Sequence, residues 1–306
     1  RPVLVKALPA LFKAMKSKDE RFLESLAKAI AHAEEDAVPG LAKVIDSGNP
    51  KAKIMAAYSL SRMRAKAVQA TPSLIKALSN NDPELRDVAA HALGRIGPGA
   101  KKAIPALIQA SKDKVVDVRS EAVEALAEID SNKKVVQAVL AALKDKSPKV
   151  RRSAVRACGD LKSKAKDAVP TLIALLDDKD LGEHWGVIRT LGEMGPDAKS
   201  AADKIATFAK KLDAEESAIV ANALLRMKVK KELALKIYQA IFDLSKRSDW
   251  VYPRARVLEQ IESIGADAAP LTRLLSRLAR SRRLDEFTRN KARAILTKLR
   301  ESIQID

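Results

Sequence analysis

The stretch from Asn80 to Gly97 reads NNDPELRDVAAHALGRIG, and it has the features of one short amphipathic helix with both ends marked. Asp82 is placed to cap the helix, because its carboxylate can accept a free backbone N–H, and Pro83 suits a first turn that needs no N–H. Apolar residues follow at spacings of three and four and form one stripe, which Gly97 ends. A helix this short is marginal alone, so the stripe must be buried against other elements.

The same pattern returns along the chain with a nearly fixed period. The leucine of Leu93-Gly94 has counterparts at successive spacings of 33, 33, 32, 33, 33, 37 and 34 residues: Leu60, Leu93, Leu126, Cys158, Leu191, Leu224, Ile261 and Ile295. The other half of the period carries a small or apolar residue, a proline and a Leu-Ile pair, as in TPSLI at 71–75. Each period therefore predicts two antiparallel helices, and a fixed period of this size predicts a solenoid.

The repeat resembles the HEAT repeats, in particular the short bacterial kind also found in phycobilin lyases. The resemblance lies in the period, the proline, the helix cap and a basic residue that recurs at the same position of the period. The resemblance covers nearly the whole chain and implies an all-α fold, a right-handed α-solenoid of about nine helix-hairpin repeats. We expect a single array over residues 1–306, with an N-terminal cap repeat at about 1–35, regular repeats at about 36–229 and divergent, Arg-rich repeats at about 230–306. HEAT arrays serve as scaffolds, adaptors, transport receptors, lyases and a DNA glycosylase, so the fold alone does not choose a function.

Composition adds a strong charge bias. The chain carries a formal net charge of +18, which attracts polyanions: nucleic acid, anionic lipid or an acidic protein. The single cysteine, Cys158, occupies the leucine position of its repeat, so we expect a small buried core residue rather than a reactive thiol. No apolar run approaches the ~20 residues of a membrane span. We expect a soluble protein, either cytoplasmic or exported after removal of a signal peptide, and the sequence does not decide between these.

A basic residue recurs one turn into the second helix of most repeats. We interpret it as a structural ladder, not as a binding patch, and its members are Lys53, Arg86, Arg119, Arg151 and Arg254. The resemblance implies that this position pairs with an acidic or amide residue in the preceding loop. Residues of that kind precede the ladder position by six residues at Asn80, Asp113, Asp145 and Asp178.

The repeat pattern breaks at His184, which replaces the ladder arginine and is followed by Trp185. Gly182 and Gly186 flank the pair, and each glycine costs roughly 1 kcal/mol against alanine inside a helix. Two interpretations stay open. The glycines make room for a pocket or contact beside Trp185, or a large ring simply packs over small residues.

The longest period, 37 residues, indicates an insertion of about four residues between paired helices near Leu244–Gln260. Insertions in solenoids map to loops, often on the binding face, and Trp, Tyr and Arg are enriched at interface hot spots. The partner-binding candidates here are Lys246, Arg247, Trp250, Tyr252 and Arg256. The alternative is that Trp250 and Tyr252 fill the space left by the longer loop.

The last two expected helices are rich in arginine. Arg273, Arg277 and Arg280 are spaced by four and three residues, so they share one helix face. A terminal repeat needs a polar outer face for solubility, but the planar guanidinium also favours carboxylate or phosphate contacts. Both interpretations stay open.

The leading functional hypothesis is a non-catalytic scaffold or assembly subunit that binds an acidic protein surface. Nucleic-acid binding through backbone phosphates is the alternative, and contact with anionic membranes is a further one. A HEAT-like DNA glycosylase or chromophore lyase is the enzyme hypothesis, but the residue one turn after Trp185 is Arg189, where the glycosylases carry a carboxylate. No sequence motif for a metal or cofactor is present, so we expect neither.

Overall fold

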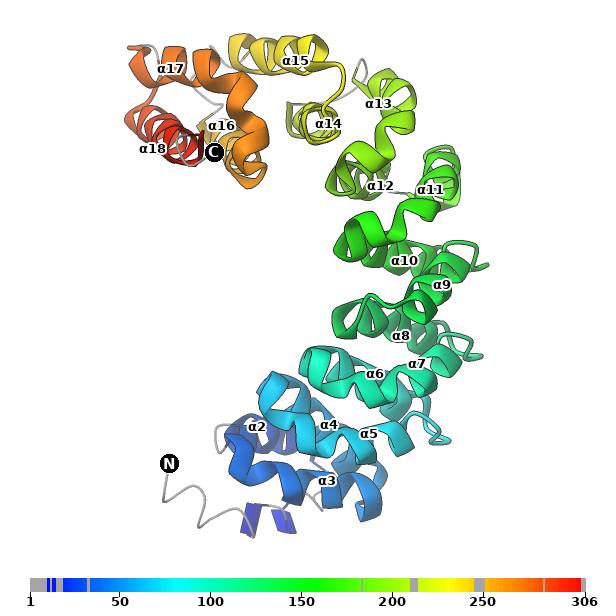
Figure 1. The fold of residues 1–306 in the computed structure, drawn as a ribbon. Coiled ribbons are helices and arrows are strands. Elements are labelled where there is room, and N and C mark those ends of the chain that lie inside the picture. The colour runs from blue at the N-terminus through cyan, green and yellow to red at the C-terminus, as the bar shows by residue number, and fades with distance from the viewer. Residues whose placement is uncertain are drawn as a thin grey trace. The chain divides into compact units, whose positions relative to one another are not determined.

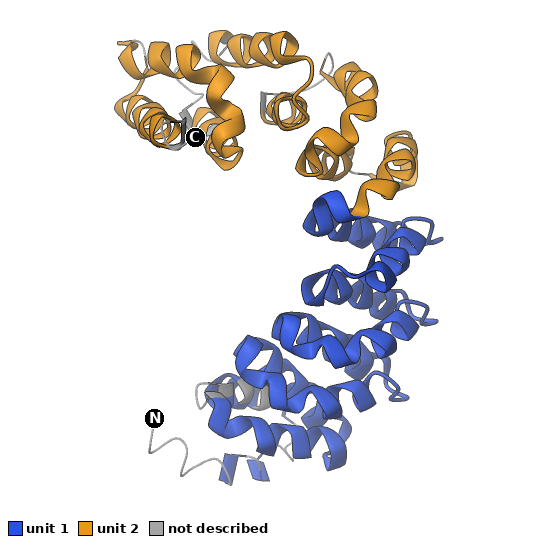
Figure 2. Ribbon diagram, in the orientation of Figure 1, with its two compact units in different colours: residues 1–164 blue, residues 165–306 orange. Residues whose placement is uncertain are grey.

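The computed structural model describes residues 10–11, 13–14, 19–31, 34–182, 184–209, 214–244, 251–282 and 284–303. Over these ranges the regular structure is α-helix and short 3₁₀ turns, without strands. The chain divides into two compact units, residues 1–164 and 165–306, which we treat separately (Figure 2). The expected single array over 1–306, with its internal boundaries, stays a prediction.

Unit 1 is a stack of helix hairpins (Figure 1). Its helices are α2 (Glu20–Ala31), α3 (Val38–Ser47), α4 (Pro50–Met63), α5 (Thr71–Ala77), α6 (Pro83–Ile96), α7 (Ile104–Ala110), α8 (Val116–Ile129), α9 (Lys133–Ala142) and α10 (Pro148–Leu161). The second helices of successive pairs, α4, α6, α8 and α10, pack against one another in that order. The first helices are shorter, and a 3₁₀ turn precedes α5 and α7, each of which has a proline in its first turn.

Unit 2 continues the helix-pair pattern. Its helices are α11 (Val169–Leu175), α12 (His184–Glu193), α13 (Ala202–Phe208), α14 (Ala214–Arg226), α15 (Lys231–Leu244), α16 (Val251–Ser263), α17 (Thr272–Arg280) and α18 (Glu286–Ile303). Together, α3 to α18 form eight helix pairs. The expected all-α architecture of helix hairpins is therefore confirmed.

The helix predicted from Asn80–Gly97 shows how the sequence sets the helix ends. It runs from Pro83 to Ile96, and the Asp82 carboxylate accepts a hydrogen bond from the Glu84 N–H at 3.0 Å. Gly97 ends it with a φ of 72°. This backbone conformation is one that glycine adopts without steric penalty, so the residue type and the helix end agree.

The core is built from Leu, Ile, Val and Ala side chains, and small residues allow the second helices to approach closely at some contacts. A Cβ placed on Gly94 would lie 2.9 Å from the Ala125 Cα, so α6 and α8 approach each other too closely there for any side chain. Cys158 is fully buried, and burial raises the pKa of its thiol to about 12. Its predicted role as a core residue is confirmed.

Candidate functional site

The ladder position of α6 holds a buried arginine that joins two neighbouring repeats. The Arg86 Nε and Nη2 donate to the two carboxylate oxygens of Asp113 at 2.8 and 2.9 Å. Its Nη1 donates to the backbone carbonyls of Asn80 and Asn81 at 2.9 and 3.1 Å. The side chain is only 7 % exposed, so the guanidinium is almost completely enclosed by these acceptors.

The same geometry recurs one repeat later. Arg119 binds both carboxylate oxygens of Asp145, at 2.8 and 2.9 Å, and the carbonyl of Asp113 at 2.9 Å. Arg151 donates to the carbonyls of Asp145 and Lys146. Each acidic loop residue thus serves two arginines, one through its carboxylate and one through its backbone carbonyl.

The expected pairing of Arg86 and Arg119 with the preceding loop is made through the backbone carbonyls of Asn80 and Asp113. The preceding loop supplies backbone carbonyls, and the carboxylate comes from the following loop. Burial alone would raise the pKa of Asp113, but hydrogen bonds from Arg86 and the Val115 N–H hold it below its ordinary value.

The residues at three other ladder positions differ from Arg86 and Arg119 in type or in contacts. Lys53 is half-buried on α4, and Arg254 is buried on α16 with its Nη1 3.7 Å from the Asp285 carboxylate. On α12, His184 is half-buried and its ring lies 5.5 Å from the ring of Phe208.

Trp185 is half-buried beside His184 and contacts the same phenylalanine. Its ring meets Phe208 edge-on at 6.5 Å. A Cβ on Gly182 or Gly186 would meet no described atom within 4 Å, so close packing there requires neither glycine. The open space beside Trp185 keeps the contact hypothesis as a prediction.

The expected insertion lies mostly outside the described residues. This holds for Lys246, Arg247 and Trp250, while Tyr252 belongs to α16, of which the backbone is described at that residue. Arg256 is exposed on α16, and its Nη1 lies 3.3 Å from the Glu215 carboxylate.

Arg273, Arg277 and Arg280 are all exposed on one side of α17, while Leu274, Leu275 and Leu278 are buried on the other. None of the three arginines has a carboxylate within 4 Å among the described residues, and α17 itself contains no acidic residue. We call Arg273, Arg277 and Arg280 the α17 basic face.

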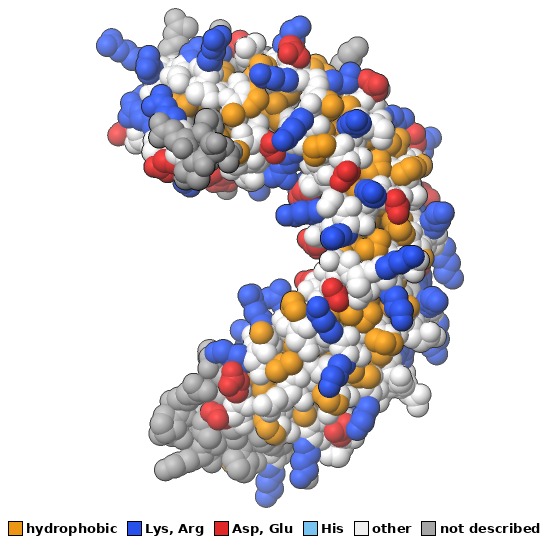
Figure 3. Space-filling model, in the orientation of Figure 1, with side chains coloured by type: hydrophobic (Ala, Val, Ile, Leu, Met, Phe, Trp, Pro, Cys, Tyr) orange, Lys and Arg blue, Asp and Glu red, His pale blue; other side chains and the backbone are white. Residues whose placement is uncertain are grey.

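The solvent-exposed sides of α4, α6, α8 and α10 form a second surface, which we call the second-helix face. On α8 it carries a strip of four carboxylates: Asp117, Glu121, Glu124 and Glu128. Ion pairs link this strip to both neighbours, because His91 on α6 pairs with Glu121 at 2.7 Å, and Lys149 and Arg156 on α10 pair with Asp117 and Glu124. Across the face drawn in Figure 3, acidic side chains likewise lie among the basic ones.

Partial burial, neighbouring carboxylates and one hydrogen bond shift the pKa values of three groups on this face. Burial, together with the charges of Glu121 and Asp117, raises the pKa of Asp87 to about 6. Burial also raises the pKa of Glu128. The hydrogen bond to Glu121 raises the pKa of His91, which favours its cationic form.

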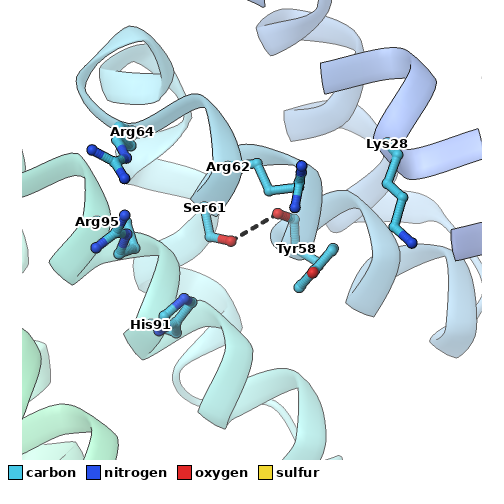
Figure 4. A pocket seen from close by; sticks show the side chains of 7 residues that line it. All are labelled: Lys28, Tyr58, Ser61, Arg62, Arg64, His91 and Arg95. Carbon is cyan, nitrogen blue, oxygen red and sulfur yellow. Dashed lines mark hydrogen bonds between the residues drawn. The ribbon is translucent and has the colours of Figure 1, made fainter. Parts of the chain in front are cut away.

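Sequence reasoning did not find a basic pocket at the α2 side of this face. The cavity measures about 420 Å³ and lies among α2, α4, the turn after α4, and α6 (Figure 4). We call it the basic pocket, and its lining residues are Lys28, Tyr58, Ser61, Arg62, Arg64, His91 and Arg95. Arg62 and Arg95 occupy equivalent positions of consecutive repeats, 33 residues apart, and this register was the signal available in the sequence.

Comparison with known proteins identifies the family to which this arrangement of helix pairs belongs. A family model described as HEAT repeats matches residues 38–127, 71–144 and 136–227. The chain belongs to the HEAT-repeat family. The resemblance inferred from the sequence is thereby confirmed, and with it the α-solenoid fold class.

Solved structures similar to this HEAT-repeat protein share its fold. An engineered protein is 22 % identical with a TM-score of 0.52, and the alignment covers 97 % of this chain and 90 % of that one. Yeast importin-β (Kap95p) is 16 % identical with a TM-score of 0.60, over 99 % of this chain and 48 % of its own. The complex of CpcE and CpcF of phycocyanin lyase from Nostoc is 22 % identical with a TM-score of 0.52, over 75 % and 94 %.

The HEAT-repeat chain spans about half the length of importin-β, and no curated protein matches its sequence. Its described residues include no group of three or more His, Cys, Asp or Glu side chains that could hold a metal ion. Among the described helices, none is both long enough and apolar enough to cross a membrane.

Proposed function

We propose that this HEAT-repeat protein is a non-catalytic scaffold that binds an acidic surface of a protein partner. The observation that carries the proposal is the α17 basic face, where three arginines stand exposed on one helix and no described residue offers them a carboxylate. The ladder arginines, by contrast, are buried and bonded to Asp113 and Asp145. The two sets therefore have different roles, although both are regularly spaced in the sequence.

The chemistry of the α17 basic face fits carboxylates. A guanidinium offers a planar fork that binds a carboxylate through two parallel hydrogen bonds, and the net charge of +18 draws acidic partners toward the protein. Packing of Leu274, Leu275 and Leu278 into the core fixes the helix, so the arginines are presented from a rigid element.

Nucleic acid is the competing partner, because the net charge would attract it equally well. The second-helix face is poorly suited to bind a long nucleic-acid strand, because the phosphates of a strand across it would meet the four carboxylates of α8. The described part of this surface also has few exposed aromatic rings on which bases could stack.

The test is co-purification of the tagged chain from its own cells, with and without nuclease. We compare the wild type with the α17 triple variant Arg273→Glu, Arg277→Glu, Arg280→Glu. The matched control, Lys133→Glu, Lys134→Glu, Lys164→Glu, makes the same change in net charge at exposed lysines elsewhere.

We expect a stoichiometric protein partner that survives nuclease, is lost with the α17 triple variant and is kept by the control. Recovery of nucleic acid, with all proteins released by nuclease, would replace the proposal with phosphate-backbone binding. Equal loss of the partner in both triple variants would show attraction by net charge alone and would overturn the assignment to α17.

A further inference from the structure

The basic pocket of unit 1 has a charge balance unlike the rest of the second-helix face. Its lining contains three arginines, one lysine and one histidine, and no carboxylate. On the neighbouring helices the exposed cations are paired, as Lys149 is with Asp117 and Arg156 with Glu124. Positive charge is therefore concentrated at the pocket and compensated beside it.

Three cations of the pocket have no partner that would compete with a ligand among the described residues. Lys28, Arg62 and Arg64 are exposed and have no ion-pair partner in the part of the chain that the structure describes. His91 pairs with Glu121 through Nδ1, so Nε2 remains its second polar atom. Figure 4 shows Arg64, Arg95 and His91 on one side of Tyr58 and Arg62, with Lys28 on the other.

Arg64 is kept in the pocket at a conformational cost. Its φ of 54° and ψ of −135° belong to a region that glycine tolerates and other residues rarely adopt. The same register position holds Gly97, Gly195 and Gly265 in three other repeats and Lys162 and Lys228 in two more, each with positive φ. Because Lys162 carries the same strain outside the pocket, the strain does not itself mark a ligand site, but it makes Arg64 a position where glycine would relax the backbone.

We propose that the basic pocket binds a compact ligand that carries two or more phosphate groups, of the pyrophosphate or organic bisphosphate class. Three guanidinium forks, an ammonium and an imidazole supply more donors and more charge than one carboxylate can use, whereas clustered phosphates match them. The cavity, about 420 Å³, has room for more than a single phosphate.

The surroundings favour a compact ligand over a polymer. The acidic strip of α8, beginning with Asp117 and Glu121, lies next to α6 and would repel a polyanion that extended past His91. Ser61 already donates its hydroxyl to the Tyr58 carbonyl at 2.8 Å, so the Tyr58 phenol is the hydroxyl that is left for the ligand. The proposal uses no residue of α17 and does not depend on the proposed scaffold function.

The test is isothermal titration calorimetry of the full chain with inorganic pyrophosphate at constant ionic strength. The decisive variant is Arg64→Gly, because it removes one guanidinium while it relieves the strained backbone, so lost binding cannot be assigned to unfolding. Its matched control is Lys162→Gly, which relieves the same kind of backbone strain, φ 50°, at the equivalent position outside the pocket.

We expect saturable binding of one pyrophosphate, weakened about tenfold or more by Arg64→Gly and by Arg62→Gln and unchanged by Lys162→Gly. Absence of saturable binding would overturn the proposal. So would equal weakening by Lys162→Gly, which would indicate general charge attraction.

Two further titrations distinguish a compact ligand from a polymer or a membrane surface. A single-stranded oligonucleotide and vesicles with anionic headgroups are titrated against the wild type and the Arg64→Gly variant. If either binds through Arg64 while pyrophosphate does not, the pocket belongs to a polymer or a membrane surface and the compact-ligand proposal fails. If pyrophosphate alone depends on Arg64, the proposal stands.

Discussion

Arg86 and Asp113, in consecutive repeats, are joined by two parallel hydrogen bonds of 2.8 and 2.9 Å, and Arg119 and Asp145 repeat this arrangement one period later. Both arginines are buried, with side-chain exposures of 7 % and 6 %. A charge buried among such acceptors is costly to leave without its partner, so the ladder should be sensitive to the loss of either residue.

Substitution of Arg119 by alanine should lower the free energy of unfolding by about 2–4 kcal/mol, because it leaves the Asp145 carboxylate without its guanidinium. Urea unfolding followed by circular dichroism measures the change. Arg273→Ala, at an exposed residue of α17, is the control and should change stability by less than about 0.5 kcal/mol. Equal losses in the two variants would show that the ladder bond is not what stabilises the repeat.

Alanine at Gly94 should destabilise the protein, because the new Cβ would lie 2.6 Å from a Glu128 carboxylate oxygen and 2.9 Å from the Ala125 Cα. We expect a loss of about 1–3 kcal/mol, as for other overpacked sites. Gly186→Ala on α12 is the matched control, since nothing lies within 4 Å of its Cβ, and it should gain up to about 1 kcal/mol. Thermal melts that rank the two variants in the opposite order would contradict this account of the close helix contact.

Glycine at position 162 should stabilise the protein by about 1 kcal/mol, because Lys162 ends α10 with a φ of 50° and a ψ of −128°. The control is Lys164→Gly, two residues later, where no positive φ is relieved and the added chain entropy should lower stability instead. The unfolding midpoint of each variant gives the answer. A loss at both positions would mean that the Lys162 side chain contributes more than its backbone conformation costs.

Substitution of Asp87 by asparagine should raise the unfolding midpoint at pH 7.5 but not at pH 4. Burial and two nearby carboxylates raise the pKa of Asp87 from 3.8 to about 6, so the folded state prefers the protonated form. Stability from this group is fully present below pH 3.8 and is lost as the pH rises through about 6, where the ionised carboxylate becomes unfavourable. Asp167→Asn, at an exposed residue, is the control, and an equal effect of both variants at pH 7.5 would exclude the burial explanation.

The sequence predicted helix pairs and helix ends well, because those signals are local. Pro83, the cap at Asp82 and Gly97 each act within one helix, and the structure places them as expected. The bond between Arg86 and Asn80 was expected, but the Asp113 carboxylate as a second partner was not, because spacing along the chain fixes a residue's register in its own helix and does not show which neighbouring loop faces it.

The basic pocket was missed for a related reason. Lys28, Arg62 and Arg95 come from α2, α4 and α6, about one repeat apart, and no one of them marks a pocket by itself. The signal available in the sequence was the register that Arg62 and Arg95 share, 33 residues apart. The aromatic insertion was conspicuous in the sequence, and its Trp250 lies outside the described residues, so its role stays a prediction.

The ladder also determines how the repeats open. In a stacked array, each repeat adds its own stability and a coupling to its neighbour, and the Arg86–Asp113 and Arg119–Asp145 bonds strengthen that coupling across α6, α8 and α10. The equivalent residues of α12 and α14 are His184 and Ser217, which cannot form a guanidinium–carboxylate fork. Amide protons of α6, α8 and α10 should therefore exchange with solvent in one cooperative event, while α12 and α14 open separately and at lower free energy.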